Sequence, residues 1–156
     1  MKLPRYPVNQ LNDCTFKFYS KGPRGRFELR VIFTRELYEG HHELYNLAFG
    51  CWDSDLEDID DKIELKNKDA DKVLSTVANI TFHFLKQNPA AFVFAQGSTP
   101  SRTRKYQMGI AKYLKDLPTN FRIEGLKQDD NPAVETHWAD FEIGTNYQAF
   151  ILYSRV

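Results

Sequence analysis

Hydroxyl, glycine and cationic side chains follow an apolar stretch near position 97, a combination suited to holding an anion. The set consists of Gly97, Ser98, Thr99, Ser101, Arg102 and Arg104. The glycine allows a backbone to approach a ligand closely, and the arginines can make forked, charge-assisted hydrogen bonds to phosphate or carboxylate. A helix predicted to begin at Pro100 adds backbone N–H groups that point the same way. The sequence therefore predicts a phosphate-binding junction between a strand and a helix.

The first turns of that helix carry three cations, Arg102, Arg104 and Lys105. Cations at a helix N-terminus oppose the helix dipole, at a cost of roughly 0.3–1 kcal/mol each. A negative partner is therefore expected, either a ligand or the acidic run at 53–61, where six of nine residues are carboxylates. Both alternatives remain open, and the convergence of Gly97 and the hydroxyls on the helix start favours the ligand.

Motifs that would name a reaction are missing from the sequence. The junction at Gly97 lacks the GxxxxGK[ST] and GxGxxG patterns of nucleotide-binding loops. The acidic run lacks the glycine and the final glutamate of a calcium-binding EF-hand. We therefore expect neither a metal nor a cofactor.

Composition limits the classes of function. The chain has 156 residues, and its 21 basic and 21 acidic side chains cancel, so nucleic-acid binding would depend on a local patch. The two cysteines, Cys14 and Cys51, form no CxxC pair and are expected to be reduced. No apolar run approaches the roughly 18 residues of a membrane helix. We expect one cytosolic domain over 1–156, with no membrane partner.

The spacing of apolar residues predicts an α+β fold with a largely antiparallel, mixed sheet of about six or seven strands and two main helices. An extended lead-in over 1–13 comes first. The expected strands are 15–20, 27–33, 42–51, 62–66, 91–96, 120–126 and 147–154, and the expected helices are 69–87 and 100–116. Asn67 or Asp69 is expected to cap the first helix, and Thr99 the second. A polar loop is expected over 128–136.

Several stretches resemble a family of small bacterial proteins classed as a domain of unknown function. These stretches are Lys2–Pro7, Ser20–Gly25, Leu44–Gly50, Lys72–Ala78 and the segment from Gly97 to Tyr106. The resemblance covers nearly the whole chain. It implies a bacterial, cytosolic protein and brings no established activity.

The order of elements is also similar to that of the GNAT acetyltransferase fold. That fold binds the acyl-CoA pyrophosphate at a [QR]xxGx[GA] turn between its fourth strand and the following helix. The corresponding turn here, Lys66–Asp71, has no glycine and two carboxylates. The resemblance implies a general-acid role for Tyr106. It rests on the order of elements alone.

We expect a binding protein for a phosphate-bearing ligand, a nucleotide or a nucleic acid, at the Gly97 junction. Small size and an obscure family suggest a toxin–antitoxin or defence operon as the setting. The alternatives are a GNAT-like acyltransferase and a module that binds a protein partner without any ligand.

Overall fold

The structure is a computed structural model that describes residues 4–36, 43–60, 66–97, 99–113, 119–127, 133 and 135–154. The elements in chain order are β1 (Asn9–Asn12), β2 (Thr15–Gly22), β3 (Gly25–Glu36), β4 (Leu44–Asp53), β5 (Asp58–Asp60), α1 (Ala70–Gln87), β6 (Phe92–Ala95), α2 (Pro100–Tyr113), β7 (Phe121–Lys127), β8 (His137–Asp140) and β9 (Ala149–Ser154). Within these residues no helix is both long and apolar enough to cross a membrane.

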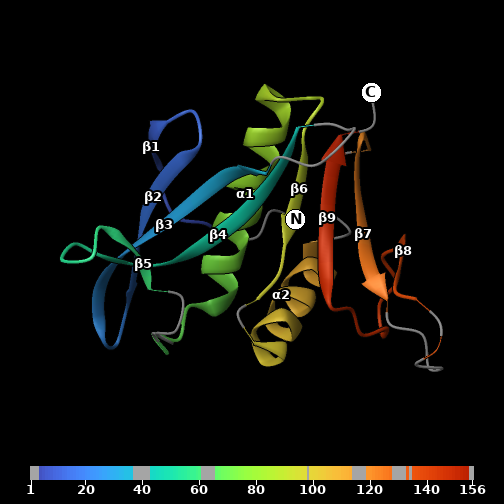
Figure 1. Ribbon diagram of the computed structural model, residues 1–156. Coiled ribbons are helices and arrows are strands. Elements are labelled where there is room, and N and C mark those ends of the chain that lie inside the picture. The colour runs from blue at the N-terminus through green and yellow to red at the C-terminus, as the bar shows by residue number, and fades with distance from the viewer. Residues whose placement is uncertain are drawn as a thin grey trace.

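All the strands join one open sheet, in the order β1-β2-β3-β4-β6-β9-β7-β8, with β5 paired to β4 (Figure 1). The pairing is antiparallel except between β4 and β6. The predicted α+β class and mixed sheet are confirmed. The predicted strand count was too low, because the described residues alone form nine strands.

The additional strands are short and polar. β1 lies in the expected lead-in, β5 in the expected acidic loop, and β8 directly after the expected loop at 128–136. Each has three or four residues, too few to show a clear alternation of apolar side chains. Each forms because a longer strand beside it offers backbone hydrogen bonds.

Both helices match their predicted positions. α1 begins one residue later than expected and ends where Asn88 and Pro89 predicted. α2 begins at Pro100 as predicted, and 114–116 lie outside the described residues. Most of the strand expected at 62–66 also lies outside them.

The two helices cover the same face of the sheet. Phe84 of α1 contacts Phe33 and Tyr45, with ring centroids 4.1 and 4.9 Å away. Tyr106 of α2 contacts Phe49, at 5.1 Å. Phe33 lies opposite Leu47 in the register of β3 and β4, and alternate residues of a strand share a face. Aromatic packing against this face forms the core.

β4 and β6 separate along their length, and the separation creates the space for a site. Their parallel pairing covers only Leu44–Leu47 and Phe92–Ala95. β4 then continues to Asp53. Its last residues, from Cys51 onward, pair with β5. Figure 1 shows the two strands close together at one end and apart at the other. Phe49 lies in the part of β4 that β6 no longer accompanies.

Candidate functional site

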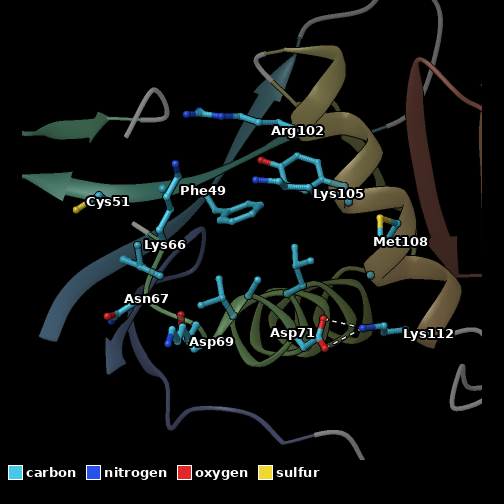
Figure 2. A pocket seen from close by; sticks show the side chains of 18 residues that line it. Phe49, Cys51, Lys66, Asn67, Asp69, Asp71, Arg102, Lys105, Met108 and Lys112 are labelled. Atoms are coloured by element: carbon cyan, nitrogen blue, oxygen red, sulfur yellow. Dashed lines mark hydrogen bonds and ion pairs between the residues drawn. The ribbon is translucent and has the colours of Figure 1, made fainter. Parts of the chain in front are cut away.

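A cavity of 530 Å³ lies between the separated part of β4 and the two helices. Figure 2 shows Phe49 in its middle, with Lys66, Asn67 and Asp69 on one side and α2 on the other. Small-molecule sites typically have volumes of about 300–1,000 Å³. The cavity therefore has the size of a site for a small organic molecule.

The cavity wall is apolar where it meets the sheet and the helices. Leu29 and Phe49 contribute from the strands, Val73 and Leu74 from α1, and Tyr106 from α2. Such a surface offers little to a fully hydrated ion. It suits a ligand that has a non-polar part as well as any charge.

The rim is cationic, although the whole chain is neutral. Five cations line the cavity, namely Lys66, Lys68, Arg102, Lys105 and Lys112. Two carboxylates also line it, which gives a formal charge of +3 for the lining. One of them, Asp71, lies with both oxygens 2.8 Å from Nζ of Lys112, across the mouth between the two helices. The lining is thus a local positive patch in a neutral chain.

A buried asparagine fixes the turn that begins at Lys66. Asn67 is only 2% exposed. Its Nδ2 donates to Oγ of Ser20 and to the carbonyl of Gly25, at 3.1 and 2.9 Å, and its Oδ1 accepts from the backbone N–H of Arg24 at 2.8 Å. A Cβ at Gly22 would lie 2.1 Å from the carbonyl oxygen of Asn67, so the backbone fits only against a glycine. The β2–β3 hairpin therefore holds the turn in place.

The residues on either side of Asn67 have left-handed backbone conformations. Lys66 has φ +48° and Lys68 has φ +58°. Such conformations in residues other than glycine cost about 1–3 kcal/mol each and persist where the surroundings enforce them. Here the bonds of Asn67 enforce them, so the two lysines are held at the rim at some expense of stability.

The N-terminus of α1 opens onto the cavity without a side-chain cap. Asp69 occupies the cap position but makes no capping hydrogen bond. Its Oδ2 instead accepts from the hydroxyls of Ser20 and Tyr6, at 2.5 and 2.7 Å. The first backbone hydrogen bond into the helix is donated by Val73. The N–H groups of Ala70, Asp71 and Lys72 have no partner among the residues described, and the first two of these residues line the cavity.

The predicted junction at α2 is arranged differently. The Oγ1 of Thr99 accepts from the N–H of Arg102 at 3.2 Å, which confirms the predicted cap. The hydroxyl of buried Thr103 accepts from the N–H of Gly97 at 3.0 Å. A Cβ at Gly97 would lie 2.5 Å from the backbone nitrogen of Thr103. Gly97 is therefore required for close contact with the helix that follows it. Because Pro100 has no N–H, the start of this helix also has few N–H donors left for a ligand.

The cavity contains only part of the predicted residue set. Arg102 lines it, together with Lys105 and Tyr106, whereas Gly97, Thr99, Ser101 and Arg104 do not. Ser98 lies outside the described residues. The structure thus separates the two arginines that the sequence grouped together.

The acidic run does not pair with Arg104 in the part of the chain that the structure describes. Arg104 is exposed and makes no ion pair there. The Oδ1 of Asp53 accepts from the N–H groups of Asp55 and Leu56, at 2.9 and 3.2 Å, which stabilises a local turn. The described residues also contain no group of three or more side chains placed to hold a metal.

Cys51 lines the cavity, but its environment disfavours a nucleophilic role. Burial raises the pKa of its thiol, and the nearby carboxylates of Asp60, Asp53 and Glu28 raise it further. The thiol therefore stays protonated at neutral pH, and the reactive form of a cysteine is the thiolate.

The sequence matches one family model over residues 2–155. The chain belongs to DUF6934, a family of unknown function. No curated protein and no solved structure gives a significant match. The expected resemblance to a family of unknown function is confirmed, and the function has to be inferred from the geometry.

The sequence did not indicate that the turn at Lys66–Asp69 would line the cavity. The available signal was two lysines separated by one residue just before a predicted helix. Nothing local indicated that Asn67 would be buried or that Asp69 would turn away from its helix.

Proposed function

We propose that the protein binds a small, phosphate-bearing organic molecule in the 530 Å³ cavity. The observation that carries the proposal is the meeting of five cations and the uncapped N-terminus of α1 at the rim of an apolar wall. Helix N-termini favour phosphate because their N–H groups and dipole both point at it. Arg102 is the forked donor best suited to a phosphate.

The proposed ligand is the one that the sequence predicted, but its proposed position is the cavity and not the Gly97 junction. Arg102 belongs to both the predicted set and the cavity lining. The other donors come from the start of α1, Lys66, Lys68 and Lys105. A nucleotide has the phosphate and the flat non-polar part that such a wall suits, so nucleotides are the first probes.

A thermal-shift screen of nucleotides and short RNAs tests the proposal. A ligand that binds only the folded protein adds about 2.7 kcal/mol of stability at one hundred times its Kd. We expect at least one nucleotide to raise the melting temperature, and RNA to act more weakly because a cavity of this size holds few nucleotides.

Arg102→Ala and Arg104→Ala form a matched pair, since each removes one arginine from the first turns of α2. Charged hydrogen bonds contribute about 1.5–3 kcal/mol, so Arg102→Ala should weaken nucleotide binding by roughly 10- to 100-fold, and Arg104→Ala should leave it unchanged. If both variants lost the same amount of nucleotide affinity, the ligand would bind at the Gly97 junction and not in the cavity. If no phosphate-bearing probe binds, the proposal is wrong, and a module for a protein partner becomes the better hypothesis.

A GNAT-like acyltransferase is the second candidate. The strand order is compatible with it, since an antiparallel run of strands, β1–β5, precedes α1, and β6, parallel to β4, then precedes α2. Tyr106 lines the cavity, where an acid could protonate a leaving thiolate.

Calorimetry with acetyl-CoA separates the two candidates. Because acetyl-CoA also carries phosphates, only a tighter affinity for acetyl-CoA than for its nucleotide part alone would favour the acyltransferase. Nucleotide binding without acetyl-CoA binding would exclude it.

A further inference from the structure

A second, smaller cavity lies deeper between the helices and the sheet. Its volume is 70 Å³, and its wall includes Leu47, Val77, Phe82, Ala95 and Ile123. The hydroxyl of Thr81, which also lines it, donates to the carbonyl of Val77 at 2.9 Å. These side chains are apolar, and the Thr81 hydroxyl is already bonded within α1, so the cavity suits a hydrocarbon group.

The two cavities share part of their walls. Phe49, Leu74, Tyr106 and Gly109 line both. α1 and α2 approach each other closely here. A Cβ at Gly109 would lie only 2.9 Å from Cδ1 of Leu74, so the close approach depends on the glycine. The two cavities are therefore neighbours, and the non-polar wall of the outer one is also a wall of the inner one.

The size of the inner cavity decides which non-polar group fits. An engineered apolar cavity of about 150 Å³ binds benzene, and this cavity has less than half that volume. A ring, including a nucleobase, is too large for it. The end of an unbranched chain is narrow enough.

We infer that the ligand is an anionic amphiphile, a phosphoester whose unbranched aliphatic chain ends in the inner cavity. This inference rests on the proposed function, because the cationic rim must hold the phosphate. It narrows the ligand class from any phosphate-bearing molecule to one with an aliphatic arm.

Calorimetry with n-alkyl phosphates from ethyl to octyl, below the concentrations at which they aggregate, tests the inference on the unmodified protein. Each buried methylene should tighten binding about fourfold, until the chain end fills the inner cavity and the gain stops. A flat dependence on chain length would overturn the inference.

Ala78→Leu provides the matched variant, because Ala78 lines the inner cavity and not the outer one. It should abolish the gain from longer chains and leave the affinity for ethyl phosphate unchanged. Ala90→Leu, at an exposed position outside both cavities, should preserve the gain. If Ala78→Leu does not fold, the chain-length series on the unmodified protein still decides.

The controls separate the two possible failures. If ethyl phosphate and nucleotides bind but longer chains add nothing, only the inference is wrong. If n-alkyl alcohols bind as tightly as the phosphates, or no phosphate binds at any length, the cationic rim recognises nothing and the proposed function fails as well.

Discussion

The two helix N-termini of this protein differ in where their backbone donors are used. At α2, Thr99 caps the helix and Gly97 packs against it, so the junction satisfies its own donors. At α1, Asp69 turns away to Tyr6 and Ser20, and the first N–H groups, beside the cavity, have no partner in the part of the chain that the structure describes. The junction at α2, whose sequence resembles an anion site more closely, thus uses more of its donors within the protein. Ligand-binding capacity depends on unsatisfied donors, which residue types alone do not reveal.

The largest expected effect comes from Asn67→Leu, because this change removes the side chain that fixes the α1 junction. Two backbone groups, the N–H of Arg24 and the carbonyl of Gly25, would lose their partner. We expect a loss of about 2–4 kcal/mol in the free energy of unfolding, since three hydrogen bonds are lost, including the buried one with Ser20, and each contributes about 0.5–1.5 kcal/mol. Urea denaturation measures the loss.

Asn79→Ala is the control for Asn67→Leu, because the hydrogen bond of Asn79 with Arg5 is solvent-exposed. It should change the free energy of unfolding by less than about 0.5 kcal/mol. Equal effects of the two variants would show that Asn67 does not hold the turn.

Thr99→Ala examines the α2 junction. Loss of an N-cap hydroxyl costs about 0.5–2 kcal/mol, so the urea midpoint should fall while phosphate binding stays the same. Ser101→Ala supplies the comparison, because Ser101 is exposed in the first turn of the same helix and makes no capping bond among the described residues. A loss of phosphate affinity in Thr99→Ala would indicate that the ligand site lies at α2.

Alkaline pH should weaken the contact between Tyr6 and Asp69. Burial raises the pKa of Tyr6 above its usual value of 10.0, and Asp69 raises it further, although the backbone hydrogen bond from Lys21 lowers it. The folded protein therefore holds this proton to higher pH than the unfolded chain does. The resulting stability is complete below pH 10.0 and is lost as the pH rises through the folded pKa.

Tyr6→Phe tests this dependence. The variant should lose about 1 kcal/mol at pH 8, from the hydrogen bond. Its difference in unfolding free energy from the unmodified protein should shrink above pH 10.0, where Tyr6 begins to favour the unfolded chain. A difference that stays constant up to pH 11 would contradict the raised pKa.

The smallest expected effect is the coupling between Arg104 and Asp58. No ion pair joins them in the structure, and exposed pairs contribute at most about 1 kcal/mol in any case. A double-mutant cycle with Arg104→Ala and Asp58→Ala should give a coupling below about 0.5 kcal/mol. A coupling above about 1 kcal/mol would mean that the acidic run neutralises the start of α2.

Periodic patterns predicted the longer elements well. The apolar spacing in α1 and the stop at Asn88 gave its bounds to within one residue. β1, β5 and β8 were missed because they are short and polar, and their strand character comes from neighbours rather than from their own side chains.

The site was only partly predictable. Arg102 was found through the charge conflict at the start of α2, which is local in sequence. The turn at Lys66–Asp69 depends on contacts of Asn67 with Ser20 and Gly25, more than 40 residues away. Sequence patterns do not report such distant contacts, so the left-handed lysines and the uncapped helix start could be recognised only in the fold.

Mapping of backbone amide shifts by NMR during a titration with pyrophosphate tests most directly where the anion binds. Hydrogen bonding to an anion moves the resonances of the amides that donate to it. We predict the largest shifts at Ala70 and Asp71 at the start of α1, with loss of these shifts in Arg102→Ala and their retention in Arg104→Ala. Large shifts confined to Gly97 and the first turn of α2 would contradict the assignment and restore the site that the sequence predicted.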